Sequence, residues 1–164
     1  MVTAATTATG SIFSSLQEVM DPEIPVLSVV DLGIIEDIIV EEDSVTIMML
    51  PTFTACPAIR LLQSQIQQKV MSLGYQDVQV KVDDSVTWNT DRITEKGKRS
   101  LAAFGLGTPL RHAGDFSLAD IEYSACPHCG SGNTTMKSMF GSTLCRSMHY
   151  CFDCLQGFER FKPL

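Results

Sequence analysis

Apolar residues recur every three or four positions in two stretches of the chain, residues 11–20 and 57–73. This spacing places them along one side of a helix, where they can be buried together. The two stripes consist of Ile12, Leu16 and Val19, and of Ile59, Leu62, Ile66, Val70 and Leu73. The pattern predicts two amphipathic helices, the first capped by Ser11 and the second begun by Pro57. A third helix is predicted over residues 92–104, ending before Gly105.

Patterns typical of strands occupy residues 34–40, 45–50 and 78–82. The first two flank a polar turn that would close a hairpin, and in the third, valines alternate with polar residues as in a half-buried strand. The order helix-strand-strand-helix-strand-helix predicts a small α+β domain over residues 11–108, with its helices on one face of a short mixed sheet. Residues 109–122 are predicted to link this domain to a second unit, residues 123–164.

The charge of the chain is unevenly distributed. Of the 164 residues, with a net charge of −7, residues 1–125 carry −9 and residues 126–164 carry +2. An acidic main domain disfavours binding to nucleic acid or to an anionic membrane and suits a basic protein surface. The sequence has no pattern of a signal peptide and no apolar run of membrane-spanning length, so we expect a cytoplasmic protein.

Five of the six cysteines lie in the last 39 residues, four of them in the pairs CPHC (126–129) and CFDC (151–154). Each Cys-x-x-Cys pair can form a tight turn, and two such turns together make the tetrahedral thiolate site that Zn²⁺ prefers. The pattern predicts a zinc ribbon with Cys126, Cys129, Cys151 and Cys154 as ligands. The metal would be structural, since four thiolates leave no open coordination position, and so short a unit needs it to fold. An iron–sulfur cluster on the same residues, or a disulfide framework, is the alternative.

Other residues of the ribbon are interpreted as structural. Leu155 stands where a glycine usually follows the second pair, which predicts a strained turn that Gly157 would relieve. Cys145 is at the wrong interval to join either pair and is interpreted as a small buried residue, with a spare ligand or a redox thiol as the alternative. The three histidines have no telling partner and are predicted to be surface or packing residues: His112, His128 and His149.

Cys56 stands apart from the other cysteines, in the segment PTFTACPAIR (51–60). With Pro57 at the first helical position, Cys56 would be the N-cap, where backbone amides and the helix dipole favour the thiolate. The alternative is a cysteine that serves only as a small buried cap. Four polar residues in apolar company could line a pocket beside it, although each carboxylate could instead cap a turn: Asp21, Glu23, Asp31 and Thr52. No histidine or lysine belongs to this set, so a cysteine–histidine hydrolase is poorly supported.

Three segments together resemble the SufT-like iron–sulfur assembly domain family in their order and spacing. They are DPEIPVLSVVDLGII (21–35), PTFTACPAI (51–59) and VTWNTDRITEKGKRSLAAFGL (86–106), and the resemblance covers about residues 12–108. The added ribbon, with FGST-x-C (140–145) before the second cysteine pair, is similar to the PaaD (PaaJ) family of phenylacetate degradation proteins. The chain departs from these families at GLGTP (105–109), where GI-x-P-P is usual, and at Leu155.

The resemblance implies an iron–sulfur cluster assembly-like domain followed by a zinc ribbon. It implies an accessory protein, not an enzyme, that assists the maturation or maintenance of the metal centres of the multicomponent 1,2-phenylacetyl-CoA epoxidase. The partners would be its di-iron oxygenase and iron–sulfur reductase subunits. Cys56 would make a transient contact with iron or a cluster, the acidic residues would shape that site, and the ribbon would dock the client. The alternatives are a structural subunit of the epoxidase without transfer chemistry and, third, a thiol enzyme.

Overall fold

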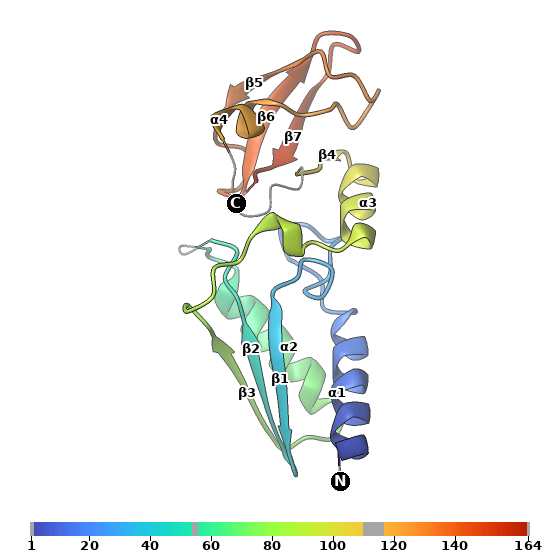
Figure 1. The fold of residues 1–164 in the computed structure, drawn as a ribbon, viewed down its shortest axis with the longest axis vertical. Coiled ribbons are helices and arrows are strands. Elements are labelled where there is room, and N and C mark those ends of the chain that lie inside the picture. Colours follow the sequence, from blue (N-terminus) through green and yellow to red (C-terminus); the bar gives the residue numbers. More distant parts are fainter. Residues whose placement is uncertain (1, 54–55, 110–116, 164) are drawn as a thin grey trace. The chain divides into compact units, whose positions relative to one another are not determined.

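The computed structural model describes residues 2–53, 56–109 and 117–163 of the chain. The backbone forms two compact units, Met1–Thr87 and Trp88–Leu164, and each has its own sheet (Figure 1). No helix in the described part of the chain combines the length and the apolar character needed to cross a bilayer.

The first unit is a three-stranded mixed sheet covered by two helices (Figure 1). Its elements are α1 (Val2–Leu16), β1 (Ile35–Glu41), β2 (Ser44–Met49), α2 (Ile59–Met71) and β3 (Asp77–Val82). The strand order is β1-β2-β3, with β1 antiparallel and β3 parallel to β2. Helix α1 packs against β1, α2 packs against β3, and the helices contact each other, so both cover the same face. The predicted α+β architecture is confirmed.

The core of the first unit follows from the two periodicities of the sequence. Alternate residues of β2 are buried, namely Val45, Ile47 and Met49, and the α2 residues Leu62, Ile66 and Val70 are buried against the sheet. The polar side of α2 also holds the sheet, because Gln63 donates to the Val80 carbonyl at 3.0 Å and Gln67 donates to that of Val78 at 2.7 Å. Gly74, just past α2, has φ +106° and provides the left-handed residue that ends the helix.

The starts of all three predicted helices differ from the prediction, and that of α2 is described below with Cys56. Helix α1 begins at Val2, so Ser11 lies inside it; the residues before Ser11 contain no proline that would stop a helix. Ile12, Leu16 and Val19 are nevertheless buried, as predicted. The third helix begins at Glu95 instead of Arg92, because Thr94 caps it by accepting the Gly97 amide at 3.0 Å.

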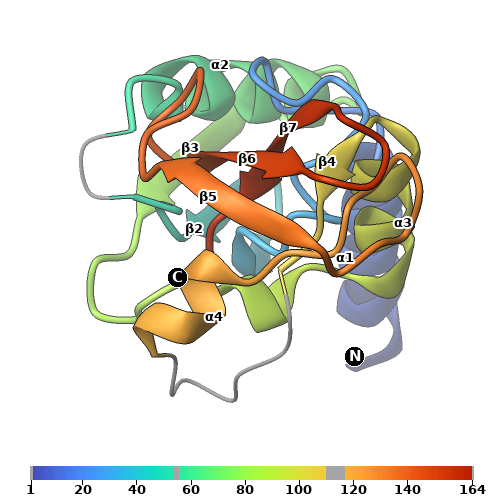
Figure 2. The same cartoon turned by 90° about the horizontal axis from the view of Figure 1, so that it is seen from above.

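The second unit contains a four-stranded sheet with the order β4-β7-β6-β5 (Figure 2). Its elements are a 3₁₀ turn (Thr90–Arg92), α3 (Glu95–Ala103), β4 (Leu106–Gly107), α4 (Leu118–Glu122), β5 (Thr134–Ser138), β6 (Arg146–Cys151) and β7 (Gly157–Phe161). The hairpin strands β5, β6 and β7 are antiparallel, and β4 is parallel to β7. Trp88 lies against Phe161, with ring centroids 5.9 Å apart.

The division between the units falls earlier than the predicted domain boundary at residue 108. Strand β4 pairs with β7, with Leu106 opposite Glu159 and Gly107 opposite Arg160, and this pairing joins the segment after Trp88 to the ribbon. A Cβ atom at Gly107 would lie 2.6 Å from the Ser124 hydroxyl and 3.1 Å from Cβ of Arg160, so these side chains would have to shift to admit a larger residue. Of the predicted linker 109–122, residues 110–116 lie outside the described residues and 118–122 form α4.

Candidate functional site

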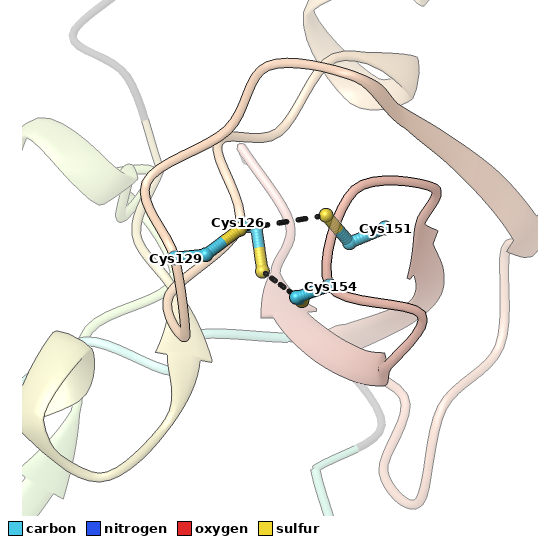
Figure 3. A group of neighbouring side chains, drawn as sticks. All are labelled: Cys126, Cys129, Cys151 and Cys154. Carbon is cyan, nitrogen blue, oxygen red and sulfur yellow. Dashed lines mark hydrogen bonds between the residues drawn. The ribbon is translucent and has the colours of Figure 1, made fainter.

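The four paired cysteines lie on two turns that face each other (Figure 3). Cys126 and Cys129 belong to the turn before β5, and Cys151 and Cys154 belong to the turn that joins β6 to β7. The turns have matching backbone bonds: the amide of Cys126 donates to Ser131 at 2.8 Å, and that of Cys151 donates to Gln156 at 2.9 Å.

One residue of each turn adopts a left-handed backbone conformation. In the first turn it is Gly130, with φ +75°, and in the second it is Leu155, with φ +59°. The predicted strain at Leu155 is therefore confirmed, since a leucine there brings its Cβ too close to a carbonyl oxygen. Gly157 does not relieve it, because this residue is extended within β7 and pairs with Tyr150.

The geometry of the four sulfur atoms fits a tetrahedral metal ion. Sγ of Cys126 lies 3.7 Å from that of Cys154, Sγ of Cys129 lies 3.6 Å from that of Cys151, and all four lie within 4.8 Å of one another. A tetrahedron with metal–sulfur bonds of about 2.3 Å has edges of about 3.8 Å. The four thiols are thus placed where they could together hold one metal ion.

The electrostatics of the cluster also favour a bound cation. Backbone N–H groups, first that of Cys154 and then that of Asp153, lower the pKa of Cys151 to about 7. Burial and the neighbouring sulfurs raise the pKa of Cys154 to about 12. Four thiols at this separation cannot all ionise near neutral pH unless a cation compensates their charge.

Asp153 links the two turns, a role that sequence reasoning did not find. Its carboxylate accepts from the Ser131 hydroxyl at 2.5 Å and from the side-chain NH₂ group of Asn133 at 2.7 Å. These bonds lower the pKa of Asp153. No local signal identifies this contact, because it exists only once the two cysteine turns have been brought together.

The remaining candidates of the ribbon lie outside the metal cluster. Cys145 was predicted to be buried, but it is partly exposed, and its sulfur lies 3.1 Å from the Thr143 hydroxyl. His149 is a packing residue, as predicted: it is buried, stacks on Phe158 at 5.5 Å, and contacts the Ser147 hydroxyl at 2.9 Å. His128 is exposed, and His112 lies outside the described residues.

Cys56 does not cap helix α2, contrary to the prediction. The helix begins at Ile59 and its cap is Ala58, because a turn closed by the Ile59 amide and the Cys56 carbonyl at 3.4 Å precedes it. The prediction that the thiolate is favoured is also wrong. Burial raises the pKa of Cys56, as do the negative charges of Glu23 and Asp21, and these effects outweigh hydrogen bonds from the Ala58 amide and the Thr52 hydroxyl.

The structure therefore brings Asp21, Glu23 and Thr52 within reach of the Cys56 thiol. Asp21 is buried and also caps a turn, since it accepts the amides of Glu23 at 2.8 Å and Ile24 at 2.9 Å. Asp31 is buried as well, and it accepts a hydrogen bond from the Ser28 hydroxyl at 2.8 Å. Glu23 and Asp21 act on the thiol through their charges, and among the described residues only the four ribbon cysteines lie close enough together to hold a metal ion.

This chain combines a mixed-sheet domain with a four-cysteine ribbon, and comparisons with known proteins match both parts. Residues 10–82 match the family described as iron-sulfur cluster assembly protein, and residues 113–162 match the PaaD zinc beta ribbon domain. An Escherichia coli (strain K12) protein, named as a putative subunit of 1,2-phenylacetyl-CoA epoxidase, is 32% identical over 99% of this chain and 97% of its own.

A crystal structure of a domain of unknown function, DUF59, from Bacillus anthracis shares the fold of part of the chain. The two superpose with a TM-score of 0.57 at 24% identity, over 62% of this chain and 97% of that one. With the near full-length relative and the two family matches, the resemblance expected from the sequence is confirmed. The chain belongs to the PaaD family.

Proposed function

We propose that this chain is an accessory protein of phenylacetate catabolism that assists the maturation or maintenance of the metal centres of 1,2-phenylacetyl-CoA epoxidase. Two findings support this proposal. The family relative carries the name of an epoxidase subunit, and the first unit matches iron-sulfur cluster assembly proteins. The chain acts in the cytoplasm with the oxygenase and reductase subunits and does not itself catalyse the epoxidation.

The observation that carries the proposal is the group formed by Cys56, Thr52, Asp21 and Glu23. At neutral pH the raised pKa keeps the Cys56 thiol protonated, so the site is not poised to attack an electrophile. A cation such as iron changes this balance, because it displaces the thiol proton and compensates the two carboxylates. We assign Cys56 and these carboxylates to transient contact with iron or a cluster as cargo, with Asp31 holding the adjacent loop through Ser28.

The ribbon has a different task in this proposal. Zn²⁺ is the ion we assign to Cys126, Cys129, Cys151 and Cys154, and it holds the two turns together. Because the four thiolates complete its coordination, the ion has no position for a substrate. The ribbon then serves as the unit that docks the epoxidase subunits, and neither nucleic acid nor a membrane is a partner.

Cys56→Ser tests the transfer role directly. Serine keeps the size of the side chain and its hydrogen-bonding capacity, but it lacks the soft sulfur that binds iron. We expect this variant to fold and to retain its zinc. In an assay reconstituted with the oxygenase and reductase, the epoxidation rate should be at least about tenfold lower than with the unmodified chain. Cys145→Ser is the matched control and should retain that support. An epoxidation rate with Cys56→Ser equal to that with the unmodified chain would rule out the transfer role.

The alternative is a structural subunit without transfer chemistry, which the name of the family relative favours. The two proposals differ in the lifetime of the complex. A structural subunit co-purifies with the oxygenase at a fixed stoichiometry whether or not Cys56 is present. A maturation factor dissociates once the client is loaded, and a purified, loaded epoxidase then keeps its activity without it.

A further inference from the structure

Cys145 and Lys162 form a pair across the ends of β6 and β7. Arg146 is opposite Phe161 in this antiparallel ladder, and the amide of Lys162 donates to the Cys145 carbonyl at 2.9 Å, which extends the register by one step. Residues directly opposite in an antiparallel pair point to the same face, with their Cβ atoms about 4.5–5.5 Å apart. The thiol and the lysine therefore share one face, and the Thr143 hydroxyl lies 3.1 Å from the sulfur.

The charges on this face favour an anion at Cys145. Lys162 is only 8% exposed, its ammonium lies 5.4 Å from the centre of the Phe140 ring, and no carboxylate within the described ranges pairs with it. The next pair on this face is Ser147 and Arg160. Arg160 is a second buried cation, and its Nε and Nη2 atoms have no hydrogen-bond partner among the described residues. Burial lowers the pKa of Lys162, and the neighbouring Cys145 opposes that effect.

The nearby carboxylates are engaged elsewhere. Glu159 lies on the opposite face of the sheet and pairs with Arg146 at 2.9 Å. Asp120 faces Arg160, and its carboxylate accepts from the amide and the hydroxyl of Ser117 at 2.7 and 2.8 Å. No carboxylate among the described residues pairs with the Lys162 ammonium, and the thiol opposite it can supply an anion.

We propose that Cys145 is a redox-reactive thiol that a hydroperoxide oxidises to a sulfenic acid, with Lys162 stabilising the anionic sulfur before and after the reaction. The thiolate sulfur attacks one peroxide oxygen, so that a sulfur–oxygen bond forms and the oxygen–oxygen bond breaks. The leaving hydroxide takes up a proton and becomes water; sulfur loses two electrons and the peroxide gains them. The Thr143 hydroxyl donates a hydrogen bond to the sulfur. This site is independent of the transfer role of Cys56.

The test uses the full zinc-loaded chain treated with hydrogen peroxide at neutral pH, with dimedone to trap sulfenic acid and peptide mapping to locate it. We expect Cys145 to be labelled before Cys56 and the four ribbon ligands. Its labelling should be faster than the oxidation of N-acetylcysteine, and zinc should not be released. Lys162→Met should slow the labelling of Cys145 about three- to tenfold, as expected for the loss of one cross-strand charge, and Lys162→Arg should restore it.

Lys137→Met is the matched control. Lys137 also belongs to the ribbon and lies over aromatic rings, those of Tyr150 and Phe152 at 5.6 Å, but it is not paired with Cys145. It should leave the rate unchanged. Equal rates for Lys162→Met and Lys137→Met would overturn the proposal. If Lys162→Met does not fold, the unmodified chain decides, and labelling of Cys145 no faster than oxidation of N-acetylcysteine overturns it as well.

Discussion

The thiol of Cys56 is under opposing influences. The amide of Ala58 and the hydroxyl of Thr52 donate hydrogen bonds that favour the thiolate, whereas burial and the charges of Glu23 and Asp21 favour the protonated thiol and prevail. In the proposed transfer role, the thiol would stay protonated until a cation displaces its proton.

Cys56 should therefore alkylate more slowly than a free cysteine at neutral pH. Its pKa is raised, so the thiolate fraction is smaller, and the rate should increase about tenfold per pH unit until the pH passes that raised pKa. Glu23→Gln removes one of the negative charges and should speed the reaction. Peptide-resolved alkylation with iodoacetamide against N-acetylcysteine measures both. A faster reaction of Cys56 than of the free thiol would contradict this reading of the site.

These two sites show which residues a sequence can identify. The four ribbon ligands are recognisable because each pair lies within one short turn, so the spacing itself encodes the geometry. The environment of Cys56 is not encoded locally. The carboxylates that oppose its ionisation come from the segment around residues 21–23, more than 30 positions away in the sequence.

At the scale of elements, the two cysteine turns have the same backbone path but different residues at the left-handed position. Leu155 is 69% exposed, so its side chain gains little from packing while its backbone is strained. Leu155→Gly should stabilise the metal-bound ribbon by about 1 kcal/mol, because a non-glycine residue in this conformation costs about 1–2 kcal/mol. Zinc competition with a chromophoric chelator should show slower release.

Gly130→Ala is the reciprocal variant of the first turn. A Cβ atom at Gly130 meets no other group within 4 Å, so the substitution adds backbone strain without a steric clash. It should weaken zinc retention by about the same amount. Equal zinc release from all three proteins would mean that the conformation of this residue does not limit the stability of the site.

The elements that could be predicted are those with a repeating pattern. The buried residues Leu62, Ile66 and Val70 of α2 and the alternation in β3 are visible in the sequence, whereas Leu73 of the predicted stripe lies beyond the helix and is exposed. The start of α1 was missed because residues 2–10 have no apolar stripe, and β4 was missed because two residues carry no periodicity. Such a strand exists only through its partner, here Glu159 and Arg160 of β7.

At the scale of the whole molecule, the charge distribution limits the partners. Residues 1–125 carry −9, and the +2 of residues 126–164 is cancelled by the charge of about −2 on a zinc ion with four thiolates. We expect only feeble binding to DNA or RNA at physiological salt, since little positive field remains to attract phosphate. Fluorescence anisotropy with labelled oligonucleotides measures this. A submicromolar, salt-sensitive affinity would make the ribbon a nucleic-acid-binding surface.

The two units should also differ in their dependence on metal. The first is held by apolar residues such as Ile47 and Ile66, whereas the small cluster of Cys126, Cys151 and Phe158 in the second depends on the cysteine turns. We expect about one zinc ion per chain. Its removal by a chelator, or Cys126→Ser, should abolish the protection of β5–β7 amides from hydrogen exchange while those of β2 and α2 remain protected. Cys145→Ala is the control and should keep both zinc and protection.

The same measurement tests where the units divide. Because Leu106 and Gly107 pair with Glu159 and Arg160, the amides around β4 should lose protection together with the ribbon when zinc is removed. If the first domain instead extends to residue 108 as a folding unit, these amides will stay protected with β2 and α2. If these amides lose protection together with the ribbon, the folding boundary lies near Thr87, where the chain divides into its two compact units. Strand β4 then forms only while the metal holds β7 in position.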